Sequence, residues 1–179
     1  MVEIEIKAHI STSKRKDILA ICKSRFDYHG AFLKEDIYYN SKSSDKIFRI
    51  RREYSSMGKW ETILNIKERN IIDNCECNNE IEFPIVDEKA FKKFVTLLGY
   101  KEFIKKEKIS YVYKHNGFSY EINNLRGLGD FIEIEYLAES KTDKELVFKK
   151  MEAILKEFDI SPSAIETNSY ISLLQQKGK

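Results

Sequence analysis

Apolar and charged residues alternate along the first strand-like segment of the chain. In residues 2–7 the side chains of Glu3, Glu5 and Lys7 fall on one face of a strand, and the apolar residues fall on the other. The same alternation recurs later, where pairs of arginines or glutamates flank Ile50 and Ile134. This pattern is typical of half-buried antiparallel strands.

The alternating segments predict an α+β protein whose dominant element is an antiparallel sheet. Short polar links between successive segments favour antiparallel neighbours. A hairpin turn is expected at 55–58, and the polar segment 69–79 is expected to be a loop. The predicted strands cover about 3–7, 31–40, 47–54, 59–68, 80–85, 103–114, 117–125 and 130–138.

Helical periodicity predicts four helices between and after these strands. The first follows the caps at 11–13, the second is capped by Asp87, the third starts at a capping box of Thr142 and Glu145, and a short fourth helix begins at 161–162. Their expected apolar stripes are Ile18, Leu19, Cys22 and Phe26, then Ala90, Phe91, Phe94, Val95 and Leu98, then Val147, Met151, Ile154 and Phe158.

About eight strands are enough to close a barrel with room for one ligand. If the helices pack outside the sheet, they cover the apolar strand residues and leave the charged faces to line the lumen. In the alternative arrangement, the apolar faces form the core and the charged faces meet water. The pattern alone leaves both open. The apolar residues in question are Ile4, Ile6, Ile50, Ile132 and Ile134.

Composition places further bounds on the function. The 179 residues are expected to form a single domain, 1–179. Although 34% of residues are charged, the net charge is only +2, which argues against a nucleic-acid polymer as the partner. No apolar run of about 20 residues or secretory signal is present, so we expect a cytoplasmic protein without a membrane contact. Cys22, Cys75 and Cys77 lack metal-clamp spacing and are expected to be reduced thiols.

The charged faces carry candidate chemistry if they line a lumen. Glutamates occur as same-strand pairs, and clustered carboxylates repel one another unless a cation binds between them. Mg²⁺ characteristically uses one or two carboxylates together with phosphate oxygens. Lysines and arginines on other strands could hold those phosphates. A polyphosphate and its metal would therefore suit such a lumen.

The motifs that carry these charges resemble those of the CYTH, or triphosphate tunnel metalloenzyme, superfamily. The segment 3–7 resembles its Glu-x-Glu-x-Lys signature, and 127–135 resembles its Gly-Leu-Gly hairpin leading into Glu-x-Glu. Between them, 36–39, 48–51, 65–67, 80–82 and 104–108 match further family motifs in the same order. The C-terminal Ser169-Tyr170 and Leu173-Leu174 resemble the tail of the class IV (CyaB-type) adenylyl cyclases.

This resemblance implies a closed eight-stranded antiparallel β-barrel, a tunnel with a charged lumen and helices packed outside. It implies a metal-dependent adenylyl cyclase, a phosphorus–oxygen lyase that converts ATP to 3′,5′-cyclic AMP and pyrophosphate. The alternative is a triphosphatase acting on inorganic or thiamine triphosphate, and a third reading is a nucleotide- or polyphosphate-binding module. A homodimer is also expected by resemblance.

The resemblance also assigns roles to particular residues. Expected catalytic cations are Lys7, Arg49, Arg51, Lys67, Lys106 and Lys108, which would also bind substrate together with Glu80, Glu82 and Asn123. Expected ligands for Mg²⁺ or Mn²⁺ are Glu5 and Glu133, helped by Glu3 and Glu135. Asp36 and Tyr38 are expected to support these groups.

Two positions depart from the family pattern. Lys108 stands where the family has arginine, which keeps the charge but loses bidentate phosphate binding. Asn123 stands where an aspartate is usual, and Glu121 lies on the same strand face.

Overall fold

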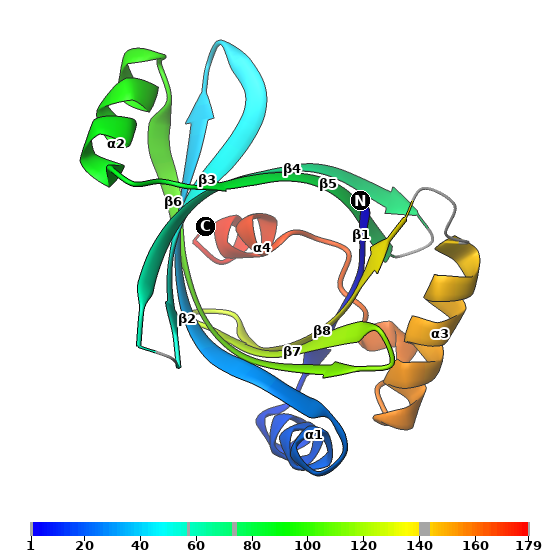
Figure 1. Cartoon of the computed structure of the whole chain (residues 1–179). Helices are drawn as coiled ribbons and strands as arrows, with labels where there is room; N and C mark the ends of the chain where they lie inside the picture. The colour runs from blue at the N-terminus through cyan, green and yellow to red at the C-terminus, as the bar shows by residue number, and fades with distance from the viewer. Residues whose placement is uncertain (1, 57, 73–74, 140–143, 179) are drawn as a thin grey trace.

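A closed β-barrel forms the body of the molecule (Figure 1). The computed structural model describes residues 2–56, 58–72, 75–139 and 144–178. Its strands are β1 (Val2–Ile10), β2 (Asp27–Ser41), β3 (Ser44–Ser55), β4 (Trp60–Ile72), β5 (Cys75–Pro84), β6 (Lys101–His115), β7 (Phe118–Leu125) and β8 (Gly129–Ala138). Its helices are α1 (Thr12–Arg25), α2 (Glu88–Leu97), α3 (Lys144–Glu157), the 3-10 turn η1 (Pro162–Ala164) and α4 (Tyr170–Lys177).

The barrel closes through the first strand. The strand order is β1-β5-β4-β3-β2-β6-β7-β8, and every neighbouring pair is antiparallel. On one side β1 pairs with β8, with Glu5 opposite Glu135, and on the other it pairs with β5, with Glu5 opposite Glu76. The predicted closed antiparallel barrel is therefore confirmed.

The apolar strand faces point outward and lie beneath helices. Ile4, Ile6, Ile132 and Ile134 are buried in one cluster that includes residues of α1 and α3, such as Met151. Figure 1 shows these two helices outside the barrel wall. Ile50 is buried in a smaller cluster with Val95 of α2. Helices cover the outside, so the charged faces line the lumen.

The segment 69–79 departs from its prediction as a loop. Strand β4 continues to Ile72 and β5 begins at Cys75, so most of the segment is paired sheet. Cys77 is buried in the outer cluster and is a free thiol, whereas Glu76 is buried within the lumen. The prediction of a loop was wrong because these polar residues belong to strands whose inner face lines a polar lumen.

Three helical predictions also need correction or fall outside the described residues. Helix α2 buries Val95, but Phe94 and Leu98 stay 55% and 54% exposed because α2 projects away from the barrel in Figure 1. The expected fourth helix is split into η1 and α4, with an extended link between them. Thr142 of the predicted capping box lies outside the described residues, and α3 is described from Lys144.

Boundary differences elsewhere are small. Strand β2 starts at Asp27, directly after α1, and not at residue 31. The turn expected at 55–58 lies between β3 and β4, although Met57 is outside the described residues. Every helix of the described part of the chain is too short or too polar to cross a bilayer.

Candidate functional site

The lumen holds a cavity of about 360 Å³ that is lined mostly by charged residues. Side chains from opposite walls of the barrel reach it because alternate residues of each strand point inward. The cavity brings together all but one of the site residues predicted from sequence, namely Glu3, Glu5, Lys7, Arg49, Arg51, Lys67, Glu80, Glu82, Lys106, Lys108, Glu133 and Glu135.

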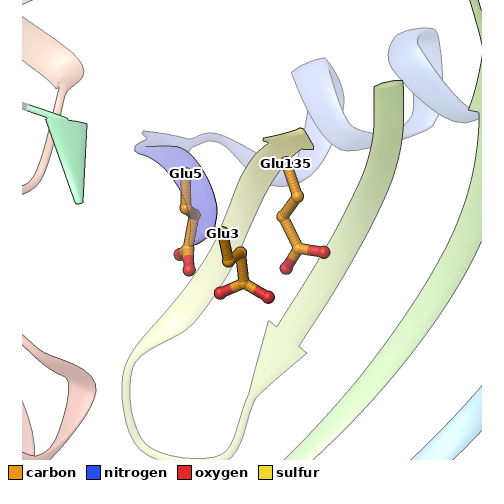
Figure 2. A group of neighbouring side chains, drawn as sticks. All are labelled: Glu3, Glu5 and Glu135. Atoms are coloured by element: carbon orange, nitrogen blue, oxygen red, sulfur yellow. The ribbon is translucent and has the colours of Figure 1, made fainter. Parts of the chain in front are cut away.

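One group of carboxylates lies where β1 meets β8. Oxygens of Glu3, Glu5 and Glu135 lie within 4.8 Å of one another, and Figure 2 shows the three side chains converging. Burial, reinforced by the nearby Glu133 carboxylate, raises the pKa of Glu5 to about 8. Burial also raises the pKa of Glu3 and of Glu135, with Glu121 adding repulsion at Glu135. In this group, the Glu3 triad, the pKa values of all three carboxylates are raised although the Lys67 ammonium lies beside Glu3.

A second group consists of Glu121, Glu133 and Glu135, so the two groups share Glu135. Here the Lys108 ammonium bridges Glu121 and Glu133 at 2.7 and 2.8 Å. Burial alone would raise the pKa of Glu133, but Lys108 more than offsets it and brings the value to about 2. The pKa of Glu121 is lowered well below its usual value by Lys108 and Lys34, against the effect of burial. Lysines therefore already pair with two members of this second triad, Glu121 and Glu133.

The opposite wall, on β2, β3 and β6, carries guanidinium and ammonium groups around one buried aspartate. Arg51 binds Asp36 through two nitrogens at 2.7 and 3.1 Å, and Lys106 approaches the same carboxylate at 2.9 Å. Arg49 donates to the Tyr38 hydroxyl at 3.2 Å and lies 3.5 Å from Asp36. Despite burial, these cations hold the pKa of Asp36 well below its usual range.

Asp36 therefore fixes the cations of this wall and does not itself line the cavity. Arg49 Nε is buried without a hydrogen-bond partner among the described residues. Arg49 and Arg51 both line the cavity, so guanidinium donors not used in these bonds could bind an anion there.

Lys67 of β4 joins three successive strands of the barrel, β4, β5 and β1. Its ammonium lies 2.9 Å from Glu3 and also pairs with Glu80. Asn65 donates to Glu80 and Glu82 at 2.8 and 3.1 Å, so both predicted acids of β5 are held by an amide. Burial would lower the pKa of Lys67, but the surrounding glutamates raise it above its usual value.

Asn123 is the predicted site residue that does not line the cavity. Its amide donates to Glu133 at 2.7 Å, and its side chain is fully buried. The amide therefore supports Glu133 from behind, where an aspartate would repel it.

Several residues that line the lumen were missing from the predicted set, among them Glu76, Arg69, Lys34 and Tyr170. Glu76 pairs with Lys7 at 3.1 Å and with Arg69. Lys34 pairs with Glu121 at 3.0 Å, and Tyr170 of α4 enters the cavity lining. The alternation Cys75-Glu76-Cys77-Asn78 was a signal for a strand with Glu76 inside, although the surrounding polarity hid it.

The lumen thus has an acidic side on β1, β7 and β8 and a cationic side on β2, β3 and β6. The Glu3 triad offers only carboxylate oxygens, which are the ligands that Mg²⁺ and Mn²⁺ prefer. The pKa values of Glu5, which is buried, and of Glu3 and Glu135, which are partly buried, are all raised, so a bound cation would stabilise the ionised carboxylates. The residues present therefore fit a divalent metal ion beside a polyanion.

Comparison with known proteins gives relatives over nearly the whole chain. The CYTH domain model matches residues 1–170. A Methanocaldococcus jannaschii protein named "Putative adenylate cyclase" is 30% identical over 178 residues, covering 97% of this chain and 98% of its own. The solved PH1819 protein of Pyrococcus horikoshii is 29% identical with a TM-score of 0.85, over 98% of this chain and 99% of its own.

A Hippeastrum protein described as having a dominant triphosphatase activity is similar in fold. It has a TM-score of 0.70 at 18% identity and covers 99% of this chain and 96% of its own. At that identity the likeness bears on the fold alone.

Proposed function

Because the chain belongs to the CYTH domain family, we propose that it binds a triphosphate together with a divalent cation in the barrel lumen and converts ATP to 3′,5′-cyclic AMP and pyrophosphate. The observation that carries this proposal is the division of the lumen into a carboxylate triad and a cationic wall that face a single cavity. The full-length similarity to a relative named as an adenylate cyclase supports the choice of reaction.

In this proposal the cationic wall holds the triphosphate. Arg49, Arg51 and Lys106 are fixed by Asp36, so they would meet phosphate oxygens without reorganising. Lys7 of β1, Lys67 of β4 and Lys108 of β6 also reach the cavity and would exchange their glutamate partners for phosphate. Phosphoryl transfer depends mainly on such positioning and charge stabilisation. The wall would therefore stabilise the charge that develops on the leaving pyrophosphate.

Glu3, Glu5 and Glu135 would hold the metal ion, Mg²⁺ or Mn²⁺. A bound cation would supply Lewis-acid stabilisation of the reacting oxygens. Glu133 is expected to contribute less directly, because it is already bound to Lys108 and Asn123. Its neighbour Glu135 belongs to both triads and would couple them.

Triphosphate hydrolysis is the second candidate, and the cavity lining favours it in one respect. Only a minority of the lining residues offer apolar or aromatic surface for a nucleotide base, namely Tyr38, Ile47, Phe48, Tyr170 and Ile171. The remaining lining residues are polar, which suits a substrate made mostly of phosphate. Attack by water in place of a ribose hydroxyl would then need only a different substrate pose.

Product analysis separates these candidates. The purified protein is incubated with ATP, inorganic triphosphate or thiamine triphosphate, with Mg²⁺ or with Mn²⁺. Cyclic AMP and pyrophosphate are expected from ATP. Orthophosphate from the shorter substrates without cyclic AMP would instead establish the triphosphatase, and binding without products would establish a binding module.

A further inference from the structure

The C-terminal segment is fastened across one end of the barrel. Ile165 forms an isolated antiparallel bridge with Ala8, and the Glu166 amide donates to the Lys7 carbonyl at 2.8 Å. Arg69 donates to the Thr167 carbonyl. At the far end of α4, Lys177 donates to the Gly127 carbonyl at 2.7 Å. These anchors hold α4 within the barrel outline seen in Figure 1.

Helix α4 places Tyr170 among the lysines of the lumen. Ser169 caps the helix by accepting from the Ser172 amide at 3.1 Å, which fixes Tyr170 as the first helical residue. The ring centroid of Tyr170 lies 4.7 Å from the Lys7 ammonium, 5.3 Å from that of Lys106 and 6.0 Å from that of Lys108. Its ring thus lies where three proposed phosphate-binding cations converge.

The hydroxyl of Tyr170 makes no hydrogen bond of normal geometry among the described residues. The side chain is 8% exposed. The hydroxyl faces the Glu133 carboxylate, and burial together with this carboxylate raises the pKa of Tyr170 well above its usual value. The same carboxylate also accepts from Lys108 and Asn123. A buried hydroxyl without a hydrogen bond of normal geometry costs free energy. Because this hydroxyl lies at a charged cavity, we take a bound ligand as the source of its acceptor.

We propose that Tyr170 is a further substrate-binding residue, whose hydroxyl donates to an oxygen of the bound triphosphate beside Lys7, Lys106 and Lys108. This inference rests on the proposed function, since it takes a triphosphate as the ligand. The helix α4 is then part of the binding site and not merely a cover for the barrel. The ring limits how far a phosphate chain extends toward this end of the lumen.

Replacing Tyr170 by phenylalanine tests the hydroxyl while keeping the ring and its lysine contacts. Binding of inorganic triphosphate to wild type and Tyr170→Phe is measured by titration calorimetry, with and without Mg²⁺, and thermal stability is measured on the same samples. We expect the dissociation constant to rise about tenfold, as for loss of a hydrogen bond to a charged group. We expect the melting temperature of the free protein to stay unchanged or to rise, because the variant removes an unsatisfied buried hydroxyl.

A matched control is Tyr136→Phe, which changes a tyrosine of β8 that packs against Phe118 outside the cavity lining. It should bind triphosphate like wild type. Unchanged binding by Tyr170→Phe would overturn the inference and leave the proposed function intact. A fall in stability that accompanies the loss of binding would also overturn it, since the hydroxyl would then be structural. If wild type bound no triphosphate, the proposed function would fail first and this inference with it.

Discussion

Glu135 is the carboxylate on which both acidic groups depend. It lies within 4.8 Å of Glu3 and Glu5 on one side and of Glu121 and Glu133 on the other. Burial and the surrounding carboxylates raise its pKa well above the usual value. A glutamine at this position would remove a carboxylate ligand from both groups at once.

We therefore predict that Glu135→Gln lowers metal-dependent kcat/KM about 100-fold, because the metal loses a ligand shared between the two triads. Steady-state kinetics over a range of Mg²⁺ and Mn²⁺ concentrations would measure this. The matched control is Glu107→Gln, on the outer face of β6, where Glu107 pairs with exposed Arg126. Activity of Glu135→Gln equal to that of the control would remove the metal-binding role from this residue.

Asn123 occupies the position where the resemblance to the family led us to expect an aspartate. Its amide donates to Glu133 at 2.7 Å, which favours the ionised form of that carboxylate. An aspartate at the same place would lose this bond and add repulsion within a fully buried site.

We predict that Asn123→Asp lowers the melting temperature of the metal-free protein and tightens binding of Mn²⁺ several-fold, because the added carboxylate needs a cation. Thermal denaturation in EDTA and calorimetric titration with Mn²⁺ measure the two effects. Asn123→Ala is the comparison, since it also loses the hydrogen bond but adds no charge. Tighter metal binding by both variants, or by neither, would contradict this account.

At the scale of elements, helices α3 and α2 pack on different parts of the barrel and bury different amounts of apolar surface. Helix α3 buries Met151 completely against the outer faces of β1 and β8, which carry the Glu3 triad on their inner faces. Helix α2 buries Val95 over a smaller cluster and leaves Leu97 77% exposed. Stability should therefore depend far more on α3 than on the outer side of α2.

We predict that Met151→Ala lowers the free energy of unfolding by about 2–5 kcal/mol, through lost burial and a residual cavity. Leu97→Ala should change it by less than about 0.5 kcal/mol, because that side chain is already in water. Chemical denaturation of both variants measures the difference. Equal losses would show that α2 packs more closely than its exposure indicates.

The alternation of residues was enough to predict the barrel elements, but not the end of β4 and the start of β5. In most strands an apolar outer face signalled burial, as with Ile132 and Ile134. In 69–79 the inner residues are polar and the outer face is made partly of cysteines, so polarity was taken for a loop. The placement of the C-terminal segment could not be predicted for another reason. The position of Tyr170 depends on long-range anchors such as Glu166 on Lys7 and Lys177 on Gly127, which no local pattern encodes.

At the scale of the whole molecule, the lumen couples stability to pH and to metal. The native pKa of Glu5 is about 8, and those of Glu3 and Glu135 are also raised. An unfolded glutamate titrates near ~4.3. Between those values the native state keeps protons that the unfolded state has lost. The free energy of unfolding of the metal-free protein should therefore fall as pH rises toward about 8.

Three other lumen acids, Glu80, Glu121 and Glu133, titrate below this window. Glu80 and Glu133 have pKa values of about 2, because lysines outweigh the effect of burial. The pKa of Glu121 is likewise lowered well below its usual value. Stability from these groups is present above the unfolded pKa and is lost only as pH falls through the native values. They therefore add no slope between pH 6 and pH 8.5.

We predict that the melting temperature in EDTA decreases from pH 6 to pH 8.5, and that saturating Mg²⁺ raises it more at pH 8.5 than at pH 6. The reason is that a cation bound to the Glu3 triad replaces the protons that burial retains there. Thermal denaturation across this range, with and without Mg²⁺, measures both trends. Glu5→Gln should flatten the slope in EDTA and reduce the Mg²⁺ shift, because its amide carries no charge at either pH. A wild-type melting temperature that rises with pH in EDTA, with a metal shift that is the same at both ends, would show that the triad does not hold these protons.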